Sequence, residues 1–78
     1  MDDYLQRKQS ATQSIYLAIK VKGLRRHPLE REVNATRCRY QLSGWDIVRC
    51  LLHAVDVYER ERKGLLEYPV ETELLNVY

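Results

Sequence analysis

The strongest constraint on the fold is the segment 44–63, whose polar side chains recur at the spacing of an α-helix. They follow one another at intervals of three and four residues, as Asp46, Arg49, His53, Asp56, Arg60 and Lys63. Such a series forms one stripe along a helix. Most other positions are apolar, and they cover an arc wider than the about 100° that a surface helix normally buries. The segment therefore predicts a long helix with two sets of neighbours, its own chain and a second copy.

Both ends of this helix carry residues that start and stop helices. Ser43 is a favourable N-cap, and Asp46 lies three residues later, where a negative charge suits the positive end of the helix dipole. Cations crowd the last turn, and Gly64 suits the left-handed position that follows a helix end. The start and stop signals therefore agree on the limits of the helix.

Residues 14–22 predict a β-strand, because apolar side chains occupy every second position. The alternating residues are Ile15, Leu17, Ile19 and Val21. The alternative is a helix over residues 3–22, which would group Tyr4, Ala11, Ile15, Ala18 and Ile19. That helix would leave Leu17 and Val21 outside its apolar stripe, so we prefer the strand.

A loop and a second strand are predicted to follow. Residues 23–32 contain Gly23, which adopts positive φ readily, and Pro28, which disfavours helical angles at His27. Residues 33–42 again alternate, with one face made of Thr36, Cys38, Tyr40 and Leu42. The two strands make a plausible antiparallel pair joined by a loop too long for a tight hairpin.

The C-terminal segment, residues 65–78, is ambiguous. Pro69 suits the start of a short helix, but Val70, Thr72 and Leu74 would also share one face of a third strand. The predicted fold class is α+β: an antiparallel strand pair, residues 14–22 and 33–42, packed on the long helix 44–63, with a short C-terminal helix or third strand. We expect one small domain, residues 1–78, with residues 1–12 as a candidate mobile arm.

The size and composition limit the class of protein. A chain of 78 residues buries a modest core, and such domains often gain stability from oligomers. No apolar run reaches membrane-spanning length, and the acidic, polar N-terminus does not resemble a signal peptide. We therefore expect a cytoplasmic protein without membrane contact, of the small type that phage or mobile elements often encode.

Charge is unevenly distributed along the chain. Residues 1–42 hold nine Lys and Arg against four Asp and Glu, a net charge of +5, whereas residues 43–78 hold four against seven, a net charge of −3. A basic region of this kind can meet nucleic acid or an acidic protein, and it can equally be a solvated face.

The predicted strands would place a set of cations on one exposed face and in the adjoining loop, beside a tyrosine. The candidate binding residues are Lys20, Lys22, Arg25, Arg26, Arg37, Arg39 and Tyr16. Lys and Arg on a strand pair can contact phosphates, and tyrosine can stack on a base. The same cations could bind an acidic protein partner.

The cysteines and histidines are weak candidates for chemistry. Cys38, Cys50, His27 and His53 could in principle form a tetrahedral zinc site, but their spacing matches no standard zinc motif. Cys50 and His53 could pair as nucleophile and base, but no oxyanion donor or orienting carboxylate accompanies them. We therefore expect no enzyme, no metal, no cofactor and no small-molecule substrate.

The apolar remainder of the long helix predicts a dimer seam. Its residues are Trp45, Leu52, Val55 and Tyr58. Trp and Tyr are frequent interface anchors, and exposed apolar helix surface commonly pairs with a second copy. The alternative is that these side chains form the core against the C-terminal element.

Two short stretches resemble the Hha/YmoA family of small nucleoid-associated modulators. They are Asp3-Tyr4-Leu5 followed by Arg7, and Tyr40-Gln41-Leu42-Ser43 at the entry to a long helix. The resemblance implies an all-helical fold, whereas residues 14–39 between these stretches predict strand. No residue role is carried over from the family.

The sequence as a whole predicts a small, non-enzymatic protein-interaction module of the regulator, inhibitor or adaptor type. We expect a homodimer that binds or occludes an acidic protein partner. The alternative is a nucleic-acid-binding protein that uses the same basic face.

Overall fold

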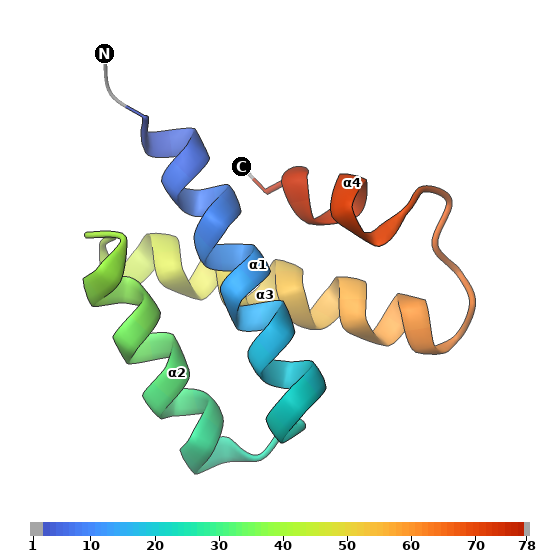
Figure 1. The fold of residues 1–78 in the computed structure, drawn as a ribbon, viewed down its shortest axis with the longest axis horizontal. Helices are drawn as coiled ribbons and strands as arrows, with labels where there is room; N and C mark the ends of the chain where they lie inside the picture. The colour runs from blue at the N-terminus through green and yellow to red at the C-terminus, as the bar shows by residue number, and fades with distance from the viewer. Residues whose placement is uncertain (1–2, 78) are drawn as a thin grey trace.

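The computed structural model describes residues 3–77, which form four α-helices (Figure 1). They are α1 (Tyr4–Lys22), α2 (Arg26–Arg39), α3 (Gly44–Arg62) and α4 (Val70–Leu75). Helix α1 crosses over α3, and α2 and α4 lie on opposite sides of this crossing (Figure 1). Because no strand occurs among residues 3–77, the predicted α+β fold with a strand pair is wrong.

The core lies where α1 crosses α3. Ile15 and Ile19 of α1 are fully buried, and so are Cys50, Ala54 and Val57 of α3. These positions recur every three or four residues on each helix, so both helices bury one stripe. Leu74 of α4 and Val77 beyond it extend the same cluster from the C-terminal side.

The strand predicted over 14–22 is the C-terminal half of α1. Residues 4–22 contain no Gly or Pro, and buried positions recur with helical period along the whole of α1: Lys8, Ala11, Thr12, Ile15, Tyr16 and Ile19. Leu17 and Val21 are 60% and 82% exposed. The alternation of four apolar residues thus combined two core positions with two surface positions, and the rejected helix alternative was correct. Residues 4–12, part of the candidate mobile arm, belong to this helix.

Helix α2 replaces most of the predicted loop and of the second strand. Pro28 lies in the first turn, where a backbone N–H has no helical partner in any case, so the proline does not prevent the helix. His27 is therefore helical, contrary to the prediction. Within α2, which is described in full, Thr36 alone is buried. The helix gives way to a short turn at Gln41, whose φ of 54° is left-handed.

Helix α3 matches the predicted helix over 44–63 to within one residue. The Ser43 side chain accepts a hydrogen bond from the backbone N–H of Asp46, as the capping pattern predicts. At the other end Gly64 has a φ of 70°, and the N–H of Leu65 donates to the carbonyl of Arg60 at 2.8 Å. These contacts form a Schellman motif that ends the helix. After Pro69 the chain forms the short helix α4, so the third-strand alternative is wrong.

The helical assignment of residues 14–22 can be tested with two neighbouring substitutions. Ile15→Ala should lower the free energy of unfolding by about 2–4 kcal/mol, because it opens a cavity at the crossing. Leu17→Ala should cost less than about 1 kcal/mol, because its side chain is exposed. Urea denaturation followed by circular dichroism measures both. Equal losses at the two positions would favour a strand face and contradict the helix.

Candidate partner-binding surfaces

Helix α3 carries a stripe of exposed apolar side chains on the side that faces away from α1. Trp45 is 72% exposed, Leu52 is 63% exposed and Val48 between them is 44% exposed. Their spacing of three and four residues places them on one side of the helix. We call these three residues the α3 stripe. Large apolar side chains grouped in this way on a small domain mark a surface for a partner.

The structure divides the predicted dimer seam. Trp45 and Leu52 belong to the α3 stripe, but Val55 and Tyr58 are half-buried and pack on the core of their own chain. Val48 was missed, although it lies one turn from both Trp45 and Leu52 and could have been found from that spacing.

An apolar hollow of about 270 Å³ borders the stripe between α2 and α3. Its apolar lining comes from Leu29 and Val33 of α2 and Leu51 of α3. Leu51 follows Val48 by three residues, so the hollow and the stripe are continuous along α3. The same side of the molecule therefore offers both exposed apolar side chains and an apolar recess.

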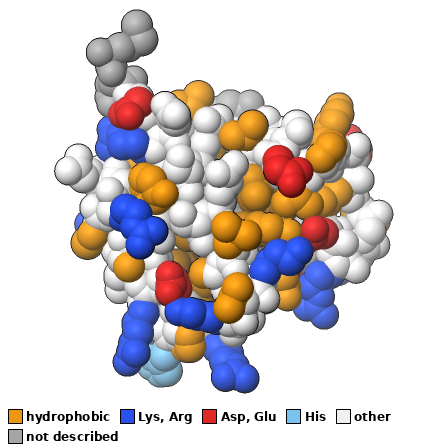
Figure 2. Space-filling model, in the orientation of Figure 1, with side chains coloured by type: hydrophobic (Ala, Val, Ile, Leu, Met, Phe, Trp, Pro, Cys, Tyr) orange, Lys and Arg blue, Asp and Glu red, His pale blue; other side chains and the backbone are white. Residues whose placement is uncertain are grey.

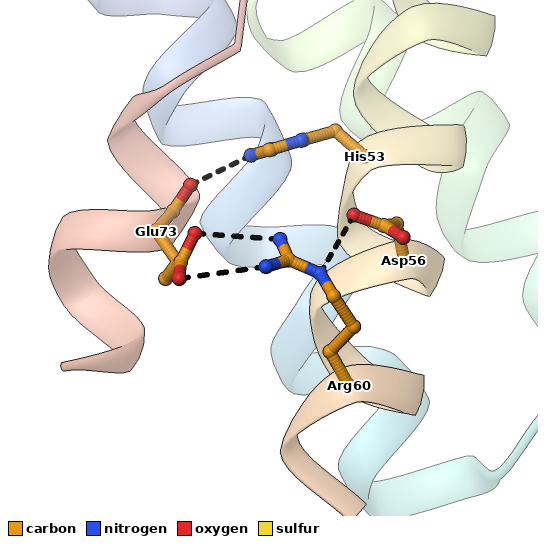
Figure 3. A network of polar contacts seen from close by, with 4 residues as sticks. All are labelled: His53, Asp56, Arg60 and Glu73. Carbon is orange, nitrogen blue, oxygen red and sulfur yellow. Dashed lines mark hydrogen bonds and ion pairs between the residues drawn. The ribbon is translucent and has the colours of Figure 1, made fainter. Parts of the chain in front are cut away.

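The polar stripe of α3 holds α4 in place instead of facing solvent along its whole length (Figure 3). The Arg60 guanidinium binds both carboxylate oxygens of Glu73, at 3.3 and 3.5 Å, and its Nε donates to Asp56 at 3.0 Å. His53 Nε2 lies 2.7 Å from the backbone carbonyl of Glu73. Glu73 is buried on α4. Because α4 binds here, it leaves the α3 stripe uncovered.

The predicted basic face is not one surface, because the strand pair that would have built it is absent. Lys20 pairs with Glu61 at 3.5 Å, Arg26 pairs with Glu30 at 3.0 Å, and Lys22 pairs with Glu32. Lys20, Lys22, Arg25 and Arg26 lie where α1 and α2 are joined, whereas Arg37 and Arg39 lie at the opposite end of α2.

Tyr16 is buried and cannot stack on a base. Its hydroxyl donates to the Glu61 carboxylate, and its ring lies under the Lys20 ammonium, 5.4 Å from the ring centre. Burial, and then the hydrogen bond to Glu61, raise the pKa of the phenol above its usual value. The tyrosine that was predicted to bind a partner thus helps to fix α1 to the C-terminal end of α3.

A hollow of about 590 Å³ lies at the junction of α1 and α2. It is lined by Val21, Lys22, Arg25, His27, Pro28 and Arg31. No carboxylate lines it, and Arg25 and Arg31 form no ion pair with any residue from 3 to 77. Figure 2 shows Lys and Arg side chains gathered at this end of the molecule beside a histidine. We call this site the basic hollow.

Four residues of the basic hollow are absent from the predicted binding set. The alternation predicts Val21 on the buried face of a strand, and the sequence predicts a loop over Pro28, His27 and Arg31. The signal that could have found the last two is their spacing of four residues, which places them together once the segment is helical.

The N-terminal turn of α1 fastens the α2–α3 connection. Arg7 donates to the backbone carbonyls of Tyr40 and Gln41, at 3.1 and 3.0 Å. The Tyr4 hydroxyl donates to the Asp46 carboxylate in the first turn of α3. The two stretches that resemble the Hha/YmoA family are thus in direct contact. Their shared role in this chain is to fix the entry to α3.

The two cysteines and two histidines do not converge on one site. Cys38 is exposed on α2, whereas Cys50 is buried and its thiol donates to the backbone carbonyl of Lys8 at 3.5 Å. His27 lines the basic hollow and His53 contacts Glu73. Over residues 3–77 no three His, Cys, Asp or Glu side chains form a group that could hold a metal ion.

The contact between Tyr4 and Asp46 should make stability depend on acid pH. The Tyr4 hydrogen bond, and then that of Ser43, hold the pKa of the Asp46 carboxyl below its usual value. The stabilisation is therefore complete above the pKa of the unfolded chain, about 3.9, and is lost as pH falls through the lower pKa of the folded chain. Tyr4→Phe removes this hydrogen bond but keeps the ring over the Lys8 ammonium.

We expect the Tyr4→Phe variant to lose less stability than the parent chain between about pH 5 and pH 2. Urea denaturation at a series of pH values measures the difference. An unchanged pH dependence in the variant would show that Asp46 is not held in this way.

The two thiols should differ in reactivity. Burial raises the pKa of the Cys50 thiol and shields it from reagents. A disulfide reagent should therefore label Cys38 within minutes under native conditions, and Cys50 only after unfolding in urea. Peptide mapping of the labelled protein identifies the site. Rapid native labelling at Cys50 would contradict the α1–α3 packing.

Comparison of the chain with family models, with curated proteins and with solved structures gives no match. None of the described helices is long and apolar enough to cross a membrane. The all-helical fold disagrees with the strands that the alternation predicts.

Proposed function

We propose that the protein is a small, non-enzymatic interaction module of the regulator, inhibitor or adaptor type, which acts by occupying the surface of a protein partner. The observation that carries the proposal is the α3 stripe, because the large apolar side chains of Trp45 and Leu52 are more than half exposed. An exposed Trp in an apolar patch is a frequent anchor of protein interfaces.

The partner of the α3 stripe in this proposal is a second copy of the chain. The stripe offers protruding side chains, and the neighbouring hollow of Leu29, Val33 and Leu51 offers a recess. A two-fold dimer needs one patch that complements itself, and a patch with both features meets that need.

The proposal includes a cytoplasmic location and an origin in a phage or mobile element, as the sequence analysis expects.

Nucleic-acid binding is the second candidate function. The observation in its favour is the basic hollow, where Arg25 and Arg31 form no ion pair with a described residue. Phosphates could be bound there without sequence readout. The burial of Tyr16 and the position of Arg37 and Arg39 at the far end of α2 weaken this candidate.

The dimer is tested by two substitutions at equally exposed leucines. Leu52→Asp places a charge in the α3 stripe and should weaken association by about 2 kcal/mol or more, since a charge at the centre of an apolar interface is left unpaired. Leu17→Asp, on α1, is the matched control and should leave association unchanged. Sedimentation equilibrium over a range of concentrations measures both variants.

Trp45 is the sole tryptophan of the chain, so its fluorescence reports on the same interface. Its emission should move to shorter wavelength as the parent chain associates and should not move in Leu52→Asp. A parent chain that stays monomeric at millimolar concentration would refute the dimer, and so would equal effects of the two substitutions.

A further inference from the structure

We propose that the groove between α1 and α2, with the basic hollow at one end, binds a short acidic protein segment that carries an apolar side chain. The inference rests on the proposed function as an interaction module, and it names the partner chemistry of a second surface. That surface shares no residue with the α3 stripe, so the two proposals can be tested independently.

The basic hollow continues along the groove. A second hollow adjoins it and shares Val21 and Lys22 with it. This second hollow runs between the helices past Leu17 and Thr36 to Arg39. From Arg31 to Arg39 the groove follows α2 for about 12 Å, at 1.5 Å per helical residue. That length suits about four residues of an extended chain.

The charges of the groove select an anionic occupant. Arg25 and Arg31 stand at one end, where neither forms an ion pair with a residue from 3 to 77. Arg39 stands at the other end, where its charge acts on Glu32 without forming an ion pair. The single carboxylate in the lining is Glu32, which is bound by Lys22 and lies close to Arg39. The Lys22 hydrogen bond and charge hold the pKa of Glu32 below its usual value. This carboxylate therefore stays ionised, and the Lys22 ammonium compensates its negative charge. A segment with acidic residues at both ends would complement the remaining cations.

The floor of the groove favours protein over nucleic acid. Leu17 and Val21 are largely exposed between the two groups of cations. A protein interface typically has an apolar centre with a charged rim. A phosphate backbone has no apolar group to cover such a centre, and nucleic-acid grooves usually add aromatic side chains for the bases. The described lining contains no Phe, Tyr or Trp, and its aromatic ring is the His27 imidazole, which lines the basic hollow and not the part of the groove with Leu17.

The test uses a fluorescein-labelled peptide of glutamates with two central leucines, titrated with the full-length chain and followed by anisotropy. Arg25→Glu with Arg31→Glu should weaken binding about tenfold or more, because two attractions become repulsions. The control, Arg62→Glu with Lys63→Glu, changes the net charge equally at exposed positions outside the groove. It should change the affinity less than about threefold, since distant exposed charges are screened.

The apolar floor is tested with the same probe. Leu17→Asp and Val21→Ser should each weaken binding about fivefold or more, because Leu17 and Val21 would cover the leucines of the peptide. A peptide with serines in place of the leucines should bind as weakly to the parent chain as the original peptide binds to Val21→Ser. Circular dichroism confirms that each variant keeps its helices, and Arg25→Gln with Arg31→Gln repeats the charge test without reversal.

The outcomes separate this inference from the dimer. Leu52→Asp should weaken self-association and leave the peptide affinity unchanged. Leu17→Asp should weaken peptide binding and leave self-association unchanged. Failure of the peptide to bind the parent chain at low salt would overturn the inference and leave the dimer standing. The inference would also be overturned if a DNA duplex binds tightly, with an affinity that Val21→Ser leaves unchanged and that Arg25→Glu with Arg31→Glu abolishes. The groove would then belong to nucleic acid.

Discussion

The structure depends on the contact between α1 and α3. Ile15 and Ile19 meet the side of α3 that contains Cys50, Ala54 and Val57, and all five are fully buried. Small side chains at Cys50 and Ala54 leave room for the isoleucines, so the helices can approach closely. The other two helices, α2 and α4, lie on opposite sides of this pair (Figure 1).

Polar contacts decide which apolar surface stays exposed. Arg60 and His53 hold Glu73, so α4 packs across the side of α3 that the sequence marks as polar (Figure 3). An apolar docking of α4 on Trp45 and Leu52 would have hidden the α3 stripe and left no evident surface for a second copy. The ion pair is partly exposed at Arg60, so its net stabilisation is modest. Its larger effect is on where the C-terminal helix lies.

The sequence predicted α3 and both of its ends, because Ser43, Asp46 and Gly64 act through local backbone contacts that need no tertiary information. It misassigned α1, because Leu17 and Val21 were taken as core residues. The groove explains why apolar residues stand there: they line a surface instead of the core. Once residues 23–42 were read as loop and strand, Arg31 and His27 could not be placed beside Arg25. Trp45 and Leu52 were predicted to belong to a dimer seam, and both are exposed. Their exposure depends on where α4 lies, which no local pattern contains.

The shallow burial of α2 has a consequence for how the groove behaves. One wall of the groove is α1, which is anchored by the core along its length, and the other wall is α2, in which Thr36 alone is buried. Segments with few buried contacts open locally at a small fraction of the global unfolding free energy. The groove is therefore bounded by one helix anchored in the core and one that is held mainly by the partly buried Leu29 and Val33 and can shift at lower cost. A ligand that bridges both walls would order α2, and part of its binding free energy would appear as slower amide exchange along that helix.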